Sequence, residues 1–326
     1  MKRVYAGIRA TGRLHLGNYL GAIKGMIELV SGGQYDCIFQ VVDLHTITTP
    51  YNPKTLQQDI HEVVLDYLGA GLPINKCHLT IQSYVPEHVL LSYLLGTIYP
   101  VSRLEDLPTY KEKKELHPKY INMGLLYYPV LMAADILVYK GEKVPVGNDQ
   151  EPHLEVSREI ARKFNQTFGS TFPEPTRFAT KAGYVPSLLG EGKMSKSIEG
   201  SYINLTDDLE TIKSKLAKAP TDIGKGENIP QEGGVAALLT FVELFEGKEK
   251  RAEYEKRYQD TGIRYQELKD KLADAIFKEL KPIQEKRKYY QDHPEIVEKI
   301  LEEGRVYCLK IAQETLKEVK QKMGLI

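Results

Sequence analysis

The sequence predicts an α/β fold, in which a doubly wound parallel sheet is followed by an α-helical C-terminal domain. Strand-like and helix-like segments alternate through the first half of the chain, which is typical of βαβ units with right-handed crossovers. Residues 36–48 form a near-continuous apolar run, as expected for a strand buried on both faces of a parallel sheet. Beyond residue 206 only helical patterns follow. Together these observations indicate a sheet domain and a separate helical part.

The individual elements follow from apolar periodicity and from turn residues. In the first half we expect strands over residues 4–8, 36–48, 77–82 and 143–147. Helices are expected over residues 16–30, 52–70, 86–99, 103–115, 122–139 and 151–168. The pair Asn52-Pro53 suits an N-cap followed by the first helical position, which places the start of the second helix there.

The second half changes in character at a glycine-bounded loop. Gly and Pro are frequent through residues 169–192, and the loop reads GEGKMSKSIEGS. Helices are then expected over residues 207–217, 234–246, 248–259, 262–290 and 294–323. We therefore divide the chain into a sheet domain (1–186), the loop (187–204), a helical domain (205–293) and a C-terminal helix (294–326) that packs back on the sheet domain.

Composition limits the classes of protein and of compartment. The formal net charge of zero neither favours nor excludes a nucleic-acid partner, because a local basic surface can exist in a neutral chain. Cys37, Cys77 and Cys308 are dispersed, which argues against a disulfide scaffold or a zinc module and fits a reducing cytosol. No signal-peptide pattern or 18-residue apolar run occurs. We expect a cytoplasmic protein without a membrane partner.

The stretch TGRLHLGNYLGA directly follows the first strand and enters a helix. Helix N-termini bind anions through unpaired N–H groups and the helix dipole. His15 and Asn18 are three residues apart and project from one side, while Gly17 lets a ligand approach the backbone. The stretch alone fits two interpretations, a phosphate site or an ordinary glycine-rich turn with a capping histidine.

The pentapeptide KMSKS at residues 193–197 changes that balance. Two lysines three apart in a glycine-flanked loop supply mobile positive charges for a polyphosphate. A solvated basic loop would also explain two lysines, but it does not explain their pairing with the first motif.

A third feature is an acid in an apolar helix. Tyr128, Met132 and Asp135 share one face of the segment GLLYYPVLMAADILV. A buried, unpaired Asp135 would be costly, so either a ligand N–H or an arginine elsewhere in the chain should satisfy it. The segments VVDLHTIT and VPVGNDQ place polar residues at carboxyl ends of strands, where open α/β sheets bind ligands. A histidine such as His45 is more often structural at that position.

The HxGN and KMSKS motifs resemble those of the class I aminoacyl-tRNA synthetases. The segments GIRATGRLHLGNYLGA, VVDLHTIT, YPVLMAADIL, VPVGNDQ and KMSKS, in this order through residues 1–200, resemble the bacterial-type tryptophanyl-tRNA synthetases. The match continues more weakly to LKPIQEKR at residues 280–287. The resemblance implies a Rossmann-like fold and ATP-dependent activation of L-tryptophan with transfer to tRNA(Trp). The alternatives are a tyrosyl-tRNA synthetase, or a synthetase-like nucleotidyltransferase or RNA-binding paralogue.

The resemblance also implies roles for individual residues. The ATP-binding residues would be Arg9, Thr11, Gly12, His15, Gly17, Asn18, Gly147, Asp149, Lys193, Met194, Ser195 and Lys196. The amino-acid-binding residues would be Tyr5, Val42, His45, Tyr128, Met132, Asp135 and Gln150. Catalysis would rest on Lys193, Lys196, Lys113, His15 and Asn18.

More specifically, Asp135 would accept the indole N–H, while Tyr128 and Gln150 would hold the amino group with His45 nearby. Mg²⁺ would arrive on the ATP phosphates without a dedicated protein site, and three dispersed cysteines cannot build an iron–sulfur cluster. Three positions depart from the family: Arg9-Ala10 stands where many relatives have Gln-Pro, and Tyr5 replaces a phenylalanine.

The resemblance further implies a homodimer with tRNA bound across both subunits and the anticodon on the C-terminal helices. Charge does not show this, because acids and bases are nearly balanced over residues 205–295. The segment KPIQEKRK at 281–288 offers candidate contacts, although a solvated helix end explains any single lysine equally well. The apolar helices at 86–99 and 122–139 could form the dimer interface or simply belong to the core.

Overall fold

The computed structural model describes residues 1–147, 150–178, 185–196 and 198–326. The described residues form a five-stranded parallel sheet in the order β3-β2-β1-β4-β5, with β1 (Lys2–Ile8) at its centre. Its neighbours are β2 (Tyr35–Val41) and β4 (Lys143–Val144), and β3 (His78–Ile81) and β5 (Thr176–Arg177) lie at the edges. The doubly wound parallel sheet predicted from the sequence is confirmed.

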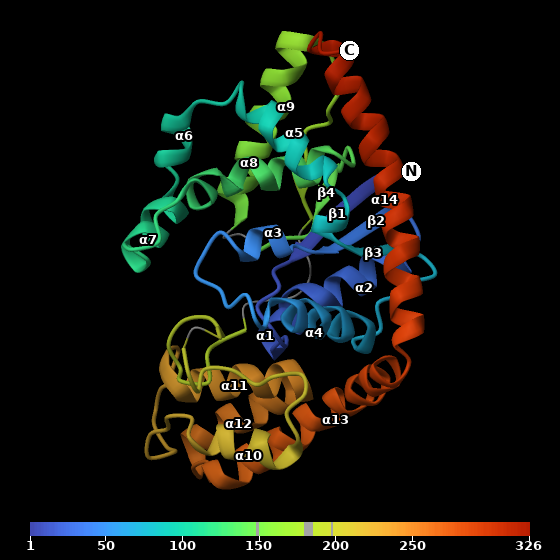
Figure 1. The fold of residues 1–326 in the computed structure, drawn as a ribbon. Helices are drawn as coiled ribbons and strands as arrows, with labels where there is room; N and C mark the ends of the chain where they lie inside the picture. Colours follow the sequence, from blue (N-terminus) through green and yellow to red (C-terminus); the bar gives the residue numbers. More distant parts are fainter. Residues whose placement is uncertain (148–149, 179–184, 197) are drawn as a thin grey trace.

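Helices cover both faces of this sheet (Figure 1). On β1, Val4 and Ala6 face a core built with α2 (Lys24–Ser31) and α4 (Leu56–Gly69), whereas Tyr5 faces the opposite side. That opposite core includes α5 (Glu87–Gly96), α8 (Met123–Leu137) and α9 (Glu151–Phe168). Because successive strand residues point to opposite faces, a strand covered on both sides is largely apolar, which explains the near-continuous apolar run in β2.

The predicted strand over residues 36–48 is wrong in its second half. The strand ends at Val41, and Asp43–Thr46 form the short helix α3. Val42 leaves the extended conformation (φ −91°, ψ 78°), and Asp43 Oδ1 accepts hydrogen bonds from the N–H groups of Leu44 (3.0 Å) and Ser83 (3.1 Å). The bond from Leu44 is local and competes with the strand ladder, and the bond from Ser83 holds the turned chain against η2 (Gln82–Tyr84).

Other predicted boundaries also shift. The helix predicted from residue 52 begins at Leu56, because Asn52 instead forms a turn in which its Oδ1 accepts the N–H of Lys54 (3.0 Å). The helix predicted over 103–115 is split into α6 (Val101–Glu105) and α7 (Pro108–Leu116), since Pro108 keeps Leu107 in an extended conformation. The strand predicted over 143–147 is reduced to β4, and β5 was not anticipated.

The first motif opens a helix that contains one wide turn. It begins as α1 (Leu16–Asn18), continues through the π-helical turn η1 (Tyr19–Ile23), and ends as α2. The short helix η2 (Gln82–Tyr84) follows β3 and lies next to α3. The short helices α3 and η2 both lie at the carboxyl ends of strands, where the sequence predicts the ligand site.

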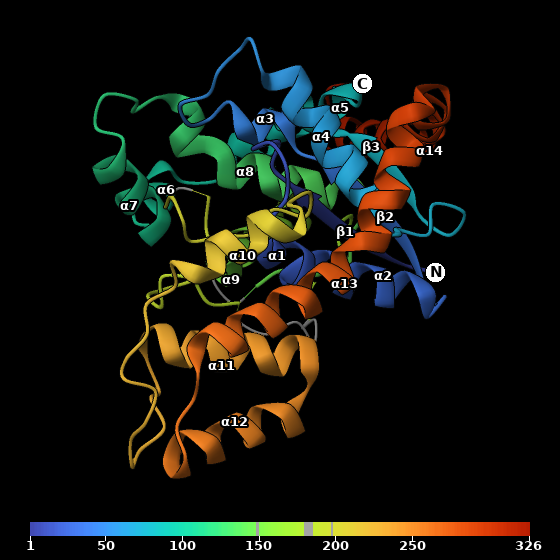
Figure 2. The same cartoon turned by 90° about the horizontal axis from the view of Figure 1, so that it is seen from below.

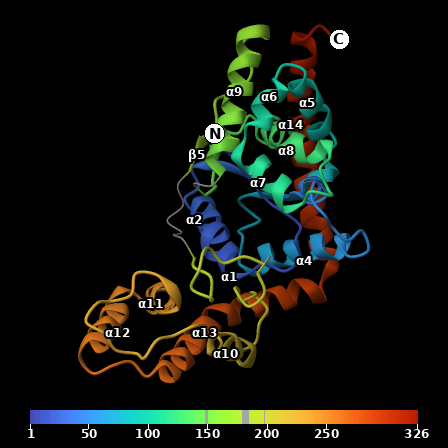
Figure 3. The ribbon, with the colours of Figure 1, turned by 90° about the vertical axis from the view of Figure 1, so that its left-hand side faces the viewer.

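Five helices follow residue 205: α10 (Leu209–Ala217), α11 (Gly233–Glu246), α12 (Lys248–Asp260), α13 (Tyr265–Asp292) and α14 (Pro294–Lys322). Figures 1 and 3 show α10, α11 and α12 grouped at one end of the molecule, from which α13 leads back to the sheet domain. The α14 helix then runs along the β3 edge, so close that a Cβ on Gly304 would lie 2.0 Å from the Leu79 carbonyl oxygen. Figure 2, seen from below, shows α13 beside α4.

A buried ion pair joins α13 to the sheet domain. Arg287 Nε donates to Asp66 Oδ1 (2.8 Å), and Arg287 also pairs with Glu62. Asp66 Oδ2 accepts the backbone N–H of Leu14 (2.6 Å), next to the first motif. One carboxylate therefore contacts both the long helix and the loop that leads into the motif. None of the helices in the described ranges is long and apolar enough to cross a membrane.

Candidate active site

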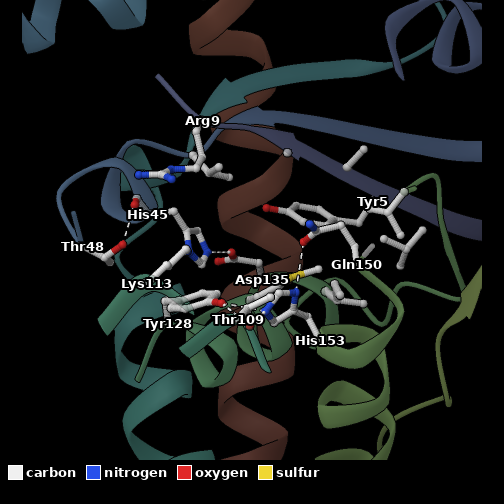
Figure 4. A pocket seen from close by; sticks show the side chains of 17 residues that line it. Tyr5, Arg9, His45, Thr48, Thr109, Lys113, Tyr128, Asp135, Gln150 and His153 are labelled. Carbon is white, nitrogen blue, oxygen red and sulfur yellow. Dashed lines mark hydrogen bonds and ion pairs between the residues drawn. The ribbon is translucent and has the colours of Figure 1, made fainter. Parts of the chain in front are cut away.

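A cavity of about 410 Å³ opens at the carboxyl ends of β1 and β2 (Figure 4). Its walls come from β1, α3, α7, α8 and the start of α9. All of the residues predicted to bind an amino acid line it: Tyr5, Val42, His45, Tyr128, Met132, Asp135 and Gln150. The cavity has the size of a small-molecule site. The shared face predicted for Tyr128, Met132 and Asp135 is confirmed.

Asp135 is fully buried and held by three side chains. Its Oδ1 lies 2.7 Å from Gln82 Nε2 and 2.7 Å from His88 Nδ1, and its Oδ2 lies 2.7 Å from His45 Nε2. Burial would raise the pKa of Asp135, but His45 and His88 outweigh it and lower the pKa to about 2. The carboxylate is therefore ionised, and its partners are two histidines and a glutamine rather than an arginine.

His45 lies between Asp135 and Tyr128. Its Nε2 lies 2.7 Å from Asp135 Oδ2, and its expected place near the amino group of a ligand stays a prediction. Its ring stands nearly perpendicular to that of Tyr128, with 6.3 Å between the centroids. His45 thus connects the two polar ends of the cavity, and the α3 turn that places it there replaces the predicted end of the strand.

A second polar group surrounds the Tyr128 hydroxyl. This oxygen lies 2.7 Å from His153 Nε2 and 3.0 Å from Thr109 Oγ1. His153 Nδ1 in turn lies 3.1 Å from Gln150 Oε1. The sequence analysis missed Thr109 and His153. His153 could have been found, because it follows Gln150 by three residues at the start of a helix and so shares its side.

Two cations, Arg9 and Lys113, also line the cavity. Arg9 Nη2 donates to Thr49 Oγ1 (2.7 Å), while Arg9 Nε is buried without a hydrogen-bond partner among the described residues. Lys113 Nζ lies 4.0 Å from the centroid of the Tyr128 ring. Burial and the nearby Arg9 charge lower the pKa of Lys113 to about 8. Two neighbouring cations in a partly buried site favour the binding of an anion.

The two sequence motifs meet beside this cavity. The N–H of Gly17 donates to Met194 Sδ at 3.3 Å, and Met194 is itself buried. Lys196 Nζ donates to the Thr11 carbonyl oxygen at 3.1 Å and lies 3.9 Å from the position of a Cβ on Gly12. Burial lowers the pKa of Lys196 to about 8, although Asp66 and Asp59 oppose the shift.

His15 begins the helix as its N-cap residue, and its backbone N–H donates to Asn18 Oδ1 (3.1 Å). Burial, followed by the charges of Lys196 and Lys193, lowers the pKa of His15 to about 4, so its ring is neutral near pH 7. Its Nδ1 is buried without a partner among the described residues.

The remaining predicted ATP residues are less closely defined. Lys193 is exposed on the loop, and the Ser195 N–H donates to Ser201 Oγ (3.3 Å). The Gly147 carbonyl oxygen accepts the Gln150 N–H (3.1 Å). Asp149 lies outside the described residues.

The sequence analysis also missed the side chains behind Asp135. Gln82 and His88 contact its carboxylate, and Gln40 and Tyr139 lie behind His88. The available signal was the same one that drew attention to Asp135, a polar residue inside an apolar segment. Gln40, for example, interrupts the apolar strand β2.

Comparison with known proteins agrees with this geometry. Residues 1–281 match the family model described as "tRNA synthetases class I (W and Y)". A tryptophan--tRNA ligase from Nostoc sp. is 39% identical over 332 residues, covering 99% of this chain and 98% of that protein. One from Caldanaerobacter subterraneus subsp. tengcongensis is 40% identical, covering 100% and 99%.

Among solved structures, a tryptophanyl-tRNA synthetase from Campylobacter jejuni complexed with ADP and tryptophan superimposes with a TM-score of 0.85. It is 30% identical in sequence, and the match covers 99% of this chain and 100% of that one. Both the full-length similarity and the shared fold lead to one conclusion: this chain belongs to the tryptophanyl-tRNA synthetases, within the class I tRNA synthetases for tryptophan and tyrosine.

Proposed function

We propose that this chain activates L-tryptophan with ATP, forming tryptophanyl-adenylate and pyrophosphate, and then transfers the tryptophanyl group to tRNA(Trp) with release of AMP. The observation that carries the proposal is Asp135, an ionised acceptor at the end of an apolar cavity. The ring of tryptophan carries an N–H donor that could pair with it. Phenylalanine lacks this donor, so its binding would leave the acceptor unpaired.

The amino acid would lie with its indole between Tyr5, Val42 and Met132, and with its polar end toward Tyr128 and Gln150. Tyr128 and Gln150 would hold the amino group. Arg9 and Lys113 line the same cavity and could hold negative charge, either the amino-acid carboxylate or the α-phosphate. Such an arrangement would keep the carboxylate beside the phosphorus atom that it attacks, so the reaction needs no nucleophile from the protein.

ATP would lie along the start of the first-motif helix. The adenine would lie beside Gly17, while His15 and Asn18 would contact the phosphates. Lys193 and Lys196 would stabilise the charge that develops on the departing pyrophosphate. The predicted roles of Thr11, Gly12, Gly147, Met194 and Ser195 toward ATP, and of Asp149 toward its ribose, belong to the same proposal.

Mg²⁺ would neutralise charge on the ATP phosphates. Among the described residues, no group of three or more His, Cys, Asp or Glu side chains could hold a metal ion. We propose that the ion is held by phosphate oxygens and water.

For the tRNA, we propose that α10–α13 of the 205–293 region bind the anticodon and that residues 1–186 carry out the chemistry. The ion pair between Arg287 and Asp66 supports a working connection between the two regions. A chain that charges tRNA acts where proteins are synthesised, so we place it in the cytoplasm.

We further propose a homodimer formed through the exposed ends of α5 and α8. Val89, Leu90, Tyr93 and Met123 are apolar and exposed there, and Tyr93 and Met123 line one shallow groove. Exposed apolar patches of this kind mark interaction sites. Sedimentation analysis of Tyr93→Glu tests the proposal: a shift to monomer is expected, and an unchanged dimer would contradict this interface.

The activity itself is tested by ATP–pyrophosphate exchange with tryptophan, tyrosine and phenylalanine compared separately. Exchange should depend on tryptophan, and the product should charge tRNA(Trp). Exchange supported by tyrosine but not by tryptophan would refute the proposal.

A further inference from the structure

A line of four hydrogen bonds runs from Tyr5 to Asp135 through the interior. The Tyr5 hydroxyl donates to Gln40 Oε1 (3.0 Å), and Gln40 Nε2 donates to the Tyr139 hydroxyl (3.0 Å). This hydroxyl lies 2.7 Å from His88 Nε2, and His88 Nδ1 lies 2.7 Å from Asp135 Oδ1. Except for Tyr5 and Asp135, these residues lie outside the cavity walls.

The donor and acceptor of each hydrogen bond in this line can be assigned in only one way. An ionised carboxylate only accepts, so His88 Nδ1 donates to Asp135. Gln40 Nε2 lies 3.3 Å from His88 Nε2, so a proton on that nitrogen would set two donors against each other. His88 Nε2 therefore accepts a hydrogen bond from Tyr139.

The hydroxyls of Tyr139 and Tyr5 donate in the same direction, toward Asp135. Having donated its one proton to His88, Tyr139 accepts from Gln40, and the amide oxygen of Gln40 accepts from Tyr5. Burial raises the pKa of the Tyr5 and Tyr139 hydroxyls well above the ordinary value, so both remain protonated donors. Every link thus points its donor toward the carboxylate.

The acceptor positions of Asp135 can now be counted. A carboxylate offers about four lone-pair positions. His88 and Gln82 occupy two on Oδ1, and His45 occupies one on Oδ2. One position on Oδ2 remains, on a residue that lines the cavity (Figure 4). The partners leave a single acceptor for a ligand.

We propose that His88 is a positioning residue for amino-acid selection, held in one tautomer by Tyr139 and Gln40, and that it keeps Asp135 as an acceptor for the ring N–H of the substrate. The inference rests on the proposed function, because the donor it serves is the indole of tryptophan. His88 does not line the cavity, so its effect on the substrate must pass through Asp135.

Two substitutions separate the bond to Asp135 from the rest of the ring. In His88→Asn the side-chain nitrogen takes the place of Nδ1 and can still donate to Asp135. In His88→Gln the amide nitrogen reaches the place of Nε2, and the donor to Asp135 is lost. A charge-assisted hydrogen bond of this kind should change affinity by about tenfold. We expect KM for tryptophan to rise about tenfold in His88→Gln and about threefold in His88→Asn, with KM for ATP unchanged in both.

A ligand without the ring N–H provides the decisive comparison. In 3-benzothienylalanine, sulfur replaces the indole N–H while the ring keeps its shape. If His88 acts through Asp135, His88→Gln should weaken tryptophan binding about tenfold and the analogue about twofold or less. Because the chain contains no tryptophan, indole fluorescence reports tryptophan binding directly, without the chemical step, and displacement of bound tryptophan reports binding of the analogue.

Equal losses for both ligands would show a merely structural effect and overturn the proposal, as would a His88→Asn variant as impaired as His88→Gln. Tyr139→Phe keeps the ring and removes the hydroxyl that donates to His88 and accepts from Gln40. It should raise KM for tryptophan about threefold with the same dependence on the ring N–H, and equal losses for both ligands in this variant would also overturn the proposal if His88→Gln does not fold. Failure of the proposed function would be distinct, because the unmodified protein would then neither bind nor activate tryptophan.

Discussion

The N–H of Gly17 and the Sδ atom of Met194 are 3.3 Å apart, although 177 residues separate them in the sequence. This contact brings the first motif and the KMSKS loop together at the start of one helix. A side chain at residue 17 would have to displace its neighbours: its Cβ would lie 2.9 Å from His15 Cε1 and 3.3 Å from Met194 Cβ. The two motifs can therefore approach this closely because residue 17 is a glycine.

Gly17→Ala should therefore impair ATP binding selectively. The added methyl displaces His15 and Met194, at a cost of about 1–3 kcal/mol typical of overpacking. KM for ATP should rise about tenfold, while KM for tryptophan stays unchanged. Gly21→Ala is the matched control on the same helix, because its Cβ would have no atom within 4 Å. Steady-state pyrophosphate exchange compares the two, and equal effects of both substitutions would contradict the assignment of this surface to ATP.

Lys196→Ala should slow adenylate formation without preventing the binding of tryptophan. If its ammonium stabilises the departing pyrophosphate, its loss should raise the activation barrier by about 2–4 kcal/mol. Single-turnover formation of the adenylate measures this step. The exposed Lys218, in the helical region, provides a control for the loss of a lysine. A single-turnover rate for Lys196→Ala close to that of Lys218→Ala would exclude the proposed role of the loop.

Activity and stability should depend on pH in opposite directions above pH 8. Lys113 and Lys196 each have a pKa of about 8, against an ordinary value of 10.5, mainly because of burial. Both must be charged to hold phosphate, so kcat/KM should fall as pH rises through about 8. Lys196→Arg, which stays charged, should leave only the Lys113 titration in this range and make the decline less steep.

Between pH 8 and 10.5 the unfolded chain holds protons that the folded chain has released at these lysines. The contribution of the two lysines to the free energy of unfolding should therefore increase with pH in this window. Denaturant titrations of the unmodified protein and of a Lys113→Met, Lys196→Met double variant isolate that contribution. The free energy of unfolding of the unmodified protein minus that of the double variant should rise across this window. A fall in this value would contradict the pKa shifts.

Arg9→Gln should stabilise the free protein while weakening substrate binding. Arg9 Nε is buried without a partner among the described residues, and its charge lies beside Lys113. Removing that charge should add about 1 kcal/mol to the free energy of unfolding. The pKa of Lys113 should rise only in part, because burial is the larger cause of its shift. Thermal unfolding with and without tryptophan and ATP checks both effects, and a free protein destabilised by Arg9→Gln would contradict them.

These sites differ in how much of them the sequence could predict. The helix face of Tyr128, Met132 and Asp135 followed from spacing alone, since side chains three and four residues apart meet on a helix. The α3 turn did not, because its apolar residues resemble a continued strand and the competing bonds come from the single carboxylate of Asp43. Local periodicity identifies helices and strands, but it does not predict where hydrogen bonds from a side chain terminate them.

The partners of Asp135 were beyond sequence reasoning for a related reason. Gln82, His88 and His45 come from separate segments, and only the folded sheet brings them to one carboxylate. The spacing could predict that the acid needed a partner, but it offered no means of choosing among distant donors. Arg9 is similar, since its Nε lacks a partner only in the context of the assembled cavity.

Asp135→Asn should remove both the substrate acceptor and an acid-sensitive part of the stability. The pKa of Asp135 is about 2 in the folded chain against an ordinary 3.8, so its ionised form contributes about 2 kcal/mol above pH 4. That contribution is lost as pH falls from about 4 through 2, because the Asp135 carboxylate then becomes protonated in both the unfolded and the folded chain. Denaturant unfolding at pH 5 and pH 2.5 should show a larger loss for the unmodified protein than for Asp135→Asn. Other carboxylates cancel in this difference. At neutral pH the variant should also raise KM for tryptophan at least tenfold, by about 1.4 kcal/mol or more, and leave the KM for 3-benzothienylalanine nearly unchanged. An equal acid sensitivity of the two proteins would show that Asp135 is not held as the anion.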